Sequence, residues 1–266
     1  MAVMEGLRLD GRTAVVTGGA GAIGAAICRD LASLGARIVV ADVDGQGAAA
    51  IADELNSESL GLGTRVGAPS GPRAPAKALR VDLTDPGSIA EFCGDAGPTD
   101  ILVHNAGVSV VEPFVGSDPA AWDLMWQVNL RGPMLLTRLL LPGMTERGWG
   151  RLVFISSDGA RAGSGGEGAY AATKAGLFGL AKTLAREAAR AEVTSNVVCP
   201  GPTDTPMLRR VDAEKPGLVD KLARGVPLRR LGAPEDVAGL VAYLCTDRAA
   251  YITGQVLSVS GGITMH

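Results

Sequence analysis

The sequence predicts a single-domain α/β protein, in which a doubly wound parallel sheet of about seven strands carries helices on both faces. Short β-rich runs alternate with helical segments along the 266 residues, and parallel strands need such crossover connections. The composition agrees, because 47% of the residues are hydrophobic, only 4% are aromatic and 37 are glycine. That profile suits close packing of helices on a sheet better than an all-β sandwich.

Seven short runs have the composition of buried strands. Each is rich in aliphatic or β-branched residues and is bounded by turn residues. The predicted strands are residues 13–17, 37–41, 78–81, 101–103, 152–155, 194–198 and 256–259.

The segments between these strands predict helices. Apolar residues recur at helical spacing from Ile23 to Leu34, and Gly35 ends that helix. Further helices are predicted at 48–55, 119–147 and 168–190. The Pro142-Gly143 pair is expected to bend or interrupt the helix at 119–147 near its end.

Residues 57–75 are rich in Gly, Pro and Ser and separate a predicted helix from the third strand. The stretch is predicted to be a surface loop; the alternative is that it lies against the adenine end of a cofactor. No linker divides the chain into two domains, so residues 1–266 are predicted to form one unit.

Charge and cysteine content exclude several classes of partner. A net charge of −3 and a pI near 5.5 argue against nucleic-acid binding. No apolar run reaches about 18 residues and no signal-peptide pattern begins the chain, which predicts a soluble protein without a membrane partner. The four cysteines form no C-x-x-C pair, so we expect reduced thiols in a cytoplasmic protein, with no disulfide and no metal site.

A glycine cluster, Gly18–Gly24, follows the first predicted strand. Glycines allow the backbone to approach a pyrophosphate, and the N-terminus of the next helix attracts the anion. A tight strand-to-helix turn also needs glycine without any ligand, but the position after the first strand favours a dinucleotide.

Asp42, at the end of the second strand, predicts the choice of dinucleotide. Its distance in sequence from the glycine cluster is close to the one at which a carboxylate at the end of the second strand accepts hydrogen bonds from the adenosine ribose. Asp44 follows, and neither 18–24 nor 43–47 contains Arg or Lys, so a 2′-phosphate would meet negative charge. NAD is therefore expected over NADP; the alternative is that Asp42 only caps the following helix.

Tyr170 and Lys174 are four residues apart and therefore share one face of a predicted helix. There the ammonium can stabilise the phenolate and lower a phenol pKa that is normally about 10. A phenolate near neutral pH is suited to proton transfer to or from an alcohol oxygen. With Ser157 upstream, this pattern indicates a hydride-transfer site for an alcohol.

Taken together, these motifs resemble the short-chain dehydrogenase/reductase family over nearly the whole chain. The matching segments, in the family's order, are Thr17-Gly-x-x-x-x-Ile-Gly24, Asn105-Ala-Gly107, Asn129, Ser157, Tyr170 with Lys174, Pro200-Gly201, 230–237, 251–255 and Gly261-Gly262. More narrowly, 157–161, 196–205 and 255–262 are similar to NAD-dependent 2-hydroxycyclohexanecarboxyl-CoA dehydrogenases. The resemblance implies a Rossmann fold.

The resemblance also implies roles for the site residues. Tyr170 is expected to be the general acid/base, with Lys174 lowering its pKa and binding the nicotinamide ribose. Ser157 is expected to hold the substrate oxygen, and Asn129 a water that relays the proton. The expected NAD contacts are Gly18, Gly21, Ile23, Gly24, Asp42, Val43, Asp82, Leu83, Asn105, Ala106, Gly107, Tyr170, Lys174, Pro200, Gly201, Thr203 and Thr205.

The chain departs from the family pattern in two places within its motifs. Ala22 stands where a second turn glycine is usual, and Gly21 beside it can supply the needed freedom. His104 replaces the first Asn of the usual N-N-A-G and is expected to pack or hydrogen-bond under the adenine side.

Residues 207–226 are expected to form a lid over the substrate. Their mild positive excess suits CoA phosphates, although a solvated helix face explains it as well.

The expected function is an NAD-dependent oxidoreductase of class EC 1.1.1.- that interconverts a secondary alcohol and a ketone, with a cyclic 2-hydroxyacyl-CoA as one substrate. The alternatives are a 3-oxoacyl carrier-protein or CoA reductase and a non-catalytic dinucleotide sensor. The resemblance implies a homotetramer, or else a homodimer, formed through the helices at 119–147 and 168–190.

Overall fold

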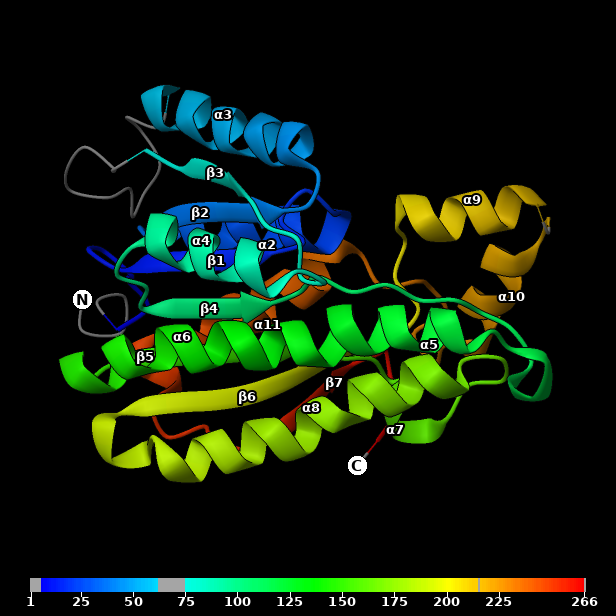
Figure 1. The fold of residues 1–266 in the computed structure, drawn as a ribbon. Coiled ribbons are helices and arrows are strands. Elements are labelled where there is room, and N and C mark those ends of the chain that lie inside the picture. The colour runs from blue at the N-terminus through cyan, green and yellow to red at the C-terminus, as the bar shows by residue number, and fades with distance from the viewer. Residues whose placement is uncertain (1–5, 62–74, 215, 266) are drawn as a thin grey trace.

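A computed structural model describes residues 6–61, 75–214 and 216–265 of the protein. Seven parallel strands form one sheet in the order β3-β2-β1-β4-β5-β6-β7, with helices on both faces (Figure 1). The predicted fold class is therefore confirmed. The strands are β1 (Thr13–Thr17), β2 (Arg37–Asp42), β3 (Lys77–Arg80), β4 (Ile101–His104), β5 (Gly150–Ile155), β6 (Val193–Pro200) and β7 (Val256–Val259).

The strand order reverses between β1 and β4, which are neighbours in the sheet although β2 and β3 separate them in sequence. Such a switch point opens a crevice at the carboxyl ends of the strands, where doubly wound proteins bind ligands. The helices around the sheet are α2 (Ala22–Ser33), α3 (Gly45–Gly61), α4 (Pro86–Ala96), α5 (Pro119–Trp126), α6 (Gly132–Arg147), α7 (Gly159–Ala162), α8 (Gly168–Glu187), α9 (Pro206–Glu214), α10 (Leu218–Gly225) and α11 (Pro234–Leu244).

Helices α4 and α11 were not predicted, although both carry a start signal. Each begins with proline, whose missing N–H and fixed φ suit the first helical position. The Asp85 carboxylate caps α4 by accepting a 2.8 Å hydrogen bond from the Gly87 N–H. Asp236 caps α11 by accepting from the Ala233 N–H at 2.7 Å.

Helix α3 is longer than the predicted 48–55 and continues through Gly61. The first residues of the predicted loop at 57–75 are therefore helical, and that part of the prediction was wrong. Residues 62–74 of the predicted loop lie outside the described residues.

The helix predicted at 119–147 is not interrupted at Pro142, because α6 runs past it to Arg147. Pro142 and Arg138 are both exposed, so water can hydrate the Arg138 carbonyl that loses its helical partner. The irregular turn lies elsewhere: a π-helical segment, η2 (Gln127–Arg131), joins α5 to α6. Such segments are frequent at functional sites.

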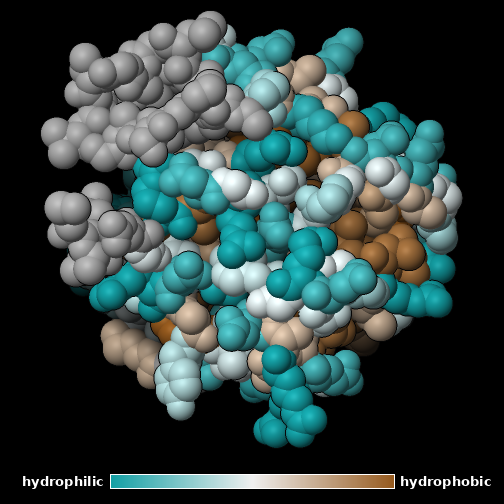
Figure 2. Space-filling view, turned by 90° about the vertical axis from the view of Figure 1, so that its left-hand side faces the viewer, coloured by the Kyte–Doolittle hydropathy of each residue, from teal (hydrophilic) through white to brown (hydrophobic). Residues whose placement is uncertain are grey.

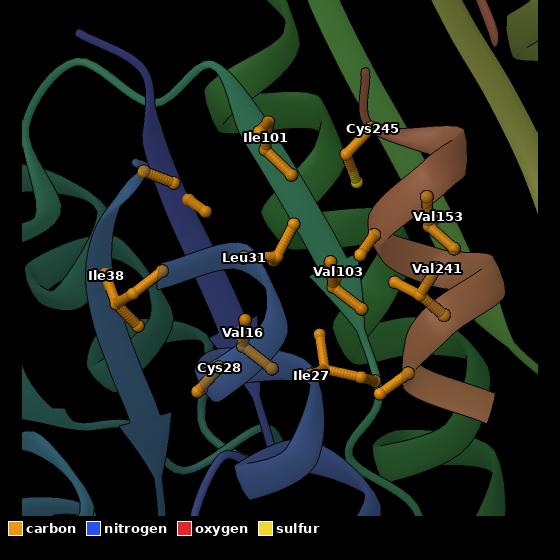
Figure 3. Packing of buried hydrophobic residues seen from close by; sticks show 14 of the residues in the cluster. Val16, Ile27, Cys28, Leu31, Ile38, Ile101, Val103, Val153, Val241 and Cys245 are labelled. Atoms are coloured by element: carbon orange, nitrogen blue, oxygen red, sulfur yellow. The ribbon is translucent and has the colours of Figure 1, made fainter. Parts of the chain in front are cut away.

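Side chains of successive strand residues point to opposite faces of the sheet and build two apolar cores. One core packs β1, β2, β4 and β5 against α2, α3 and α11, as Figure 3 shows with Val16, Ile27, Leu31, Val103 and Val241. The other packs the opposite face against α4, α6 and α8. Together they fix the strand ends that carry the site.

At the amino ends of the strands, the Trp149 ring lies between two guanidinium groups. The Arg12 and Arg151 Cζ atoms are 3.8 and 4.1 Å from the ring centroid. Arg151 is 2% exposed and forms a 3.1 Å ion pair with Asp247, which also accepts from the Trp149 indole N–H at 3.0 Å. The side of the molecule nearest these strand ends is mainly hydrophilic in the residues described there (Figure 2).

The structure describes all four cysteines, Cys28, Cys93, Cys199 and Cys245, as free thiols. Within residues 6–61, 75–214 and 216–265, no group of His, Cys, Asp or Glu side chains is arranged to hold a metal ion. None of the helices in these ranges is long and apolar enough to cross a membrane.

Candidate functional site

A cleft of about 690 Å³ lies at the carboxyl ends of β1, β2 and β4. Most of the residues that were predicted to contact the cofactor line this cleft: Gly18, Gly21, Ile23, Gly24, Asp42, Val43, Asp82, Leu83, Asn105, Ala106, Gly107 and Thr205. The predicted contacts that do not line this cleft are Tyr170, Lys174, Pro200, Gly201 and Thr203.

Two glycines of the turn cannot be replaced without displacing backbone. Gly18 has a φ of +65°, and a Cβ on it would lie 2.8 Å from the Ala106 Cα. A Cβ on Gly24 would lie 2.0 Å from the Gly18 carbonyl oxygen. The Asn105 side chain ties the turn to β4 by donating to that same oxygen at 2.9 Å. The turn therefore exposes backbone to the cleft, as a pyrophosphate cradle requires.

Asp42 faces the cleft from the end of β2. Its carboxylate accepts hydrogen bonds from the Ala20 and Asp44 N–H groups, both at 3.0 Å. The alternative that Asp42 caps α3 is wrong, because Asp44 does so by accepting from the Gly47 N–H at 3.0 Å.

Arg80 is a cation near this end of the cleft that the sequence reasoning missed. It lies opposite Asp42 in the β2–β3 register and is exposed. Its charge helps to lower the pKa of Asp82, which is lowered mainly by hydrogen bonds from the Thr84 hydroxyl and N–H. Arg80 lies on the neighbouring strand β3, far in sequence from 18–24 and 43–47, and only the pairing of β2 with β3 brings it beside Asp42.

Ser157, Tyr170 and Lys174 meet where β5 ends beside α8. The Ser157 hydroxyl lies close enough to the Tyr170 phenol to lower its pKa. Lys174 is 3% exposed; its Nζ donates to the Ile155 carbonyl at 2.9 Å and lies 6.0 Å from the centre of the Tyr170 ring. The predicted trio is thus assembled from segments separated in sequence.

The pKa of Tyr170 is raised to about 12, not lowered as the Tyr–Lys spacing predicted. Burial is the main cause, the negative charge of Glu167 adds to it, and the hydrogen bond from Ser157 opposes it. Burial also lowers the pKa of Lys174, to about 8. The prediction fails because burial dominates at the phenol, while the Lys174 ammonium donates to the Ile155 carbonyl.

Asn129 lies in the π-helical segment and is completely buried. Its side-chain amide donates to the Val108 carbonyl at 2.9 Å and to the Thr173 hydroxyl at 3.1 Å, and it accepts from the Val108 N–H at 2.8 Å. A Cβ on Gly107 would lie 2.8 Å from the Lys174 Nζ and 3.3 Å from the Asn129 Oδ1. Asn129, Gly107 and Lys174 therefore border one small space.

The residues after β6 connect several segments. The Asp158 N–H donates to the Pro200 carbonyl at 2.9 Å, and the Gly201 N–H to the Val259 carbonyl at 3.0 Å. Thr203 donates to the Gly201 carbonyl at 3.0 Å, and Thr205 accepts from the Leu208 N–H at 3.3 Å at the start of α9.

The predicted lid at 207–226 forms helices α9 and α10, which project beyond the carboxyl edge of the sheet (Figure 1). Part of its positive charge is neutralised locally, because the Arg209 Nε donates to the Asp204 carboxylate at 2.6 Å. Lys215 lies outside the described residues.

His104 packs and hydrogen-bonds, as expected, but not under the adenine side. Its ring stacks on Phe154 with centroids 4.6 Å apart, and its Nε2 is 2.9 Å from the Thr137 hydroxyl. Burial lowers the pKa of His104 to about 3, and the charge of Lys174 adds to this shift. The imidazole is therefore neutral and packs between Phe154 of β5 and Thr137 of α6.

Comparison with known proteins agrees with this geometry. A family model described as "Enoyl-(Acyl carrier protein) reductase" matches residues 18–264. The chain is 36% identical over 264 residues to the 3-oxoacyl-[acyl-carrier-protein] reductase FabG of Escherichia coli (strain K12), covering 97% of this chain and 100% of that protein.

Solved structures agree as well. A short chain dehydrogenase/reductase family protein superposes with a TM-score of 0.83 at 35% identity, covering 96% of this chain and 98% of the other. A blue fluorescent protein from a metagenomic library, in complex with NADPH, superposes with a TM-score of 0.84 at 33% identity, covering 97% and 100%. The sheet order, the cleft and these matches lead to one conclusion: the chain belongs to the short-chain dehydrogenase/reductase family of oxidoreductases.

Proposed function

We propose that this oxidoreductase interconverts a secondary alcohol and a ketone by hydride transfer, with NAD as its cofactor. The observation that carries the proposal is that the Ser157 hydroxyl acts directly on the Tyr170 phenol, close to a buried lysine whose Nζ is 6.0 Å from the centre of the Tyr170 ring. Two hydroxyl groups held together can bind one substrate oxygen and exchange a proton with it.

The cleft fits a nicotinamide dinucleotide. At Gly18 and Gly24 a Cβ would collide with backbone, which leaves the turn open for a pyrophosphate, and Asp42 lies where a ribose would bind. When bound, the cofactor supplies the ring carbon that accepts or returns the hydride. In this proposal Gly18, Gly24 and Asn105 shape the pyrophosphate site, and Lys174 holds the nicotinamide ribose.

The residues around the reacting oxygen have separate tasks. In oxidation, Tyr170 takes the hydroxyl proton, and Ser157 donates a hydrogen bond that keeps the substrate oxygen near the phenol. Asn129 fixes the Val108 backbone beside Lys174 and, by our proposal, holds the relaying water. The lid helices α9 and α10 close over the substrate.

The preference for NAD rests on Asp42, whose carboxylate would repel a 2′-phosphate. Two observations favour NADP instead. Arg80 is a cation that could attract a 2′-phosphate, and one structural relative was solved in complex with NADPH. Asp42 lines the cleft, whereas Arg80 does not, and this difference supports NAD.

A reductase of 3-oxoacyl thioesters is the second candidate, since the relative from Escherichia coli carries that activity in its name. The cyclic 2-hydroxyacyl-CoA expected from the narrower resemblance belongs to the same thioester group. The exposed side chains of Arg210, Lys221 and Arg224 on the lid would meet the phosphates of such a substrate.

The test is the initial rate of NADH formation by the purified protein. We would compare cyclohexanol, an acyclic 3-hydroxyacyl-CoA and 2-hydroxycyclohexanecarboxyl-CoA. Turnover of the simple alcohol supports the first candidate, and turnover of thioesters alone supports the second. If no alcohol is oxidised and no matching ketone is reduced with either cofactor, the proposed activity is wrong.

We also propose that the protein forms a homotetramer, or else a homodimer, through α5–α6 and α8. Large apolar side chains on α5–α6 are exposed, with Trp126 46%, Met134 44% and Leu139 48% accessible. Covering them would remove apolar area from water. Light scattering on the eluting protein measures the number of subunits directly.

A further inference from the structure

Glu167 places a carboxylate beside the two hydroxyl groups of the proposed reaction. A Cβ built on Gly159 would lie 3.3 Å from the Glu167 Oε2 and also 3.3 Å from the Ser157 Oγ. The same carboxylate acts electrostatically on Tyr170, which follows it by three residues at the start of α8. Glu167 and Ser157 therefore border a common space, and Tyr170 lies within reach of the negative charge of Glu167.

That space is open because residue 159 has no side chain. The Gly159 N–H donates to the Ser157 Oγ at 3.1 Å, which holds the hydroxyl toward this space. Ser164, in the loop before α8, also borders this space, since its Cβ is 3.5 Å from the position of the Gly159 Cβ. The Ser164 carbonyl accepts a 3.1 Å hydrogen bond from the Glu167 N–H, which holds Glu167 next to the same loop.

Across the described ranges, the Glu167 carboxylate accepts no hydrogen bond, although the residue is half-buried. Arg161, the nearest arginine in sequence, bonds instead to the Val256 carbonyl and the Ser258 hydroxyl, both at 3.0 Å. An ionised carboxylate is an acceptor only and needs donors when it loses water. A ligand bound between Ser157 and Tyr170 would therefore be expected to bring a donor to Glu167.

Resting on the proposed function, we propose that Glu167 determines specificity by selecting substrates with a second hydroxyl group next to the reacting carbinol. In a vicinal diol or polyol, one oxygen bonds to Ser157 and Tyr170 while the neighbouring O–H donates to Glu167. A β-hydroxyacyl thioester instead carries a carbonyl, which would bring a second acceptor against the carboxylate. The inferred substrate class is thus neutral vicinal diols and polyols.

The test compares kcat/KM for cis- and trans-1,2-cyclohexanediol with kcat/KM for cyclohexanol. Hydrogen bonds to charged groups imply that the wild type prefers the better diol by about tenfold to hundredfold. Glu167→Met keeps the side-chain length but removes both acceptors, so the ratio of kcat/KM for the diol to kcat/KM for cyclohexanol should fall to about one, whatever change the lost charge makes to both rates through Tyr170. Glu167→Gln retains one acceptor oxygen and should keep part of the preference.

Glu187→Met is the matched control, because Glu187 is exposed at the far end of the same helix. It should leave both rates unchanged. Thermal unfolding and NADH binding establish that each variant is folded, and Glu167→Gln keeps the test valid if Glu167→Met does not fold.

Equal rates of the wild type on the diols and cyclohexanol would overturn the inference and leave the proposed function intact. The inference is also wrong if Glu167→Met keeps the full diol preference. A wild type that oxidises neither diol nor cyclohexanol, and reduces no matching ketone, contradicts the proposed function itself.

Discussion

The side-chain amide of Asn129 and the backbone of Val108 exchange two hydrogen bonds, as two paired residues of neighbouring strands would. The Val108 N–H donates at 2.8 Å to the Asn129 Oδ1, and the Asn129 Nδ2 donates at 2.9 Å to the Val108 carbonyl. The pairing joins the loop after β4 to the π-helical segment. The Asn129 Oδ1 and the Lys174 Nζ both lie close to Gly107, the residue before Val108.

Asn129→Asp should break this pairing, because a carboxylate cannot donate to Val108 or Thr173 and would be charged in a fully buried position. We expect a loss of at least about 1–3 kcal/mol in the free energy of unfolding, measured in urea, together with a lower kcat. Thr173→Val removes one of the three contacts and should cost less. Equal stability of Asn129→Asp and the wild type would contradict the structural role given to Asn129.

Tyr170→Phe should reduce kcat by about 10²–10⁴-fold, since it removes the proposed acid/base and leaves the ring in place. NADH binding, followed by fluorescence, should be nearly unchanged. Turnover like that of the wild type would refute the mechanism.

Glu167→Gln should move the rise of alcohol oxidation to lower pH. The phenolate is the base in oxidation, so kcat/KM rises with pH as Tyr170 loses its proton. The negative charge of Glu167 raises the pKa of Tyr170, and the neutral amide does not. Because the pKa of Tyr170 is about 12, kcat/KM still rises steadily below pH 10, and a lower pKa appears as a higher kcat/KM of Glu167→Gln at each pH. The measurement is kcat/KM for cyclohexanol between about pH 6 and pH 10 in both proteins.

Lys174, with a pKa of about 8, titrates in the same window, and the Cys199 thiol also acts on Tyr170. Both groups are present in the two proteins, so the difference between the profiles reports Glu167. Superimposable profiles would show that the carboxylate does not act on the phenol.

Asp42→Ala should relax the preference for NAD, because it removes the negative charge that a 2′-phosphate would meet. We expect the ratio of kcat/KM with NAD to kcat/KM with NADP to fall by tenfold or more. Val43→Arg should lower it further by adding a cation beside Arg80. If the ratio stays the same in Asp42→Ala, Asp42 does not select the cofactor.

His104 should make stability depend on pH in the acid range. Its pKa is about 3 in the folded protein against 6.5 for an ordinary histidine, so below pH 6.5 the unfolded chain binds a proton that the folded protein does not. The contribution of the neutral ring is fully present above 6.5 and is lost as the pH falls toward 3.

Between pH 7 and pH 5 the wild type should therefore lose about 2 kcal/mol more unfolding free energy than His104→Asn. Urea titrations at the two pH values measure both losses. Other groups titrate alike in the two proteins, so equal losses would mean that His104 is not held neutral by burial.

Buried parallel strands were the easiest elements to predict, because Ile101–His104 and its neighbours are covered on both faces and form short apolar runs. The glycine turn, Tyr170 and Lys174 were found because their chemistry depends on local spacing.

Arg80 and Glu167 were not found, because their partners come from another strand or from the loop before α8. Of the two effects expected at Pro142, an interruption does not occur, because the cost of a proline in a helix depends on whether water reaches the carbonyl it leaves unpaired, and the sequence does not state this.

The stacked Arg12, Trp149 and Arg151 side chains lie at the opposite edge of the sheet from the cleft. The same strands run between the two edges, but no side-chain contact in the described residues joins the Trp149 cluster to the cleft. Substitutions at the two edges should therefore contribute almost independently to stability. A mutation that improves the site at some cost in stability can then be compensated around Trp149 without altering the chemistry. This separation makes the fold a favourable starting point for directed evolution toward new alcohols.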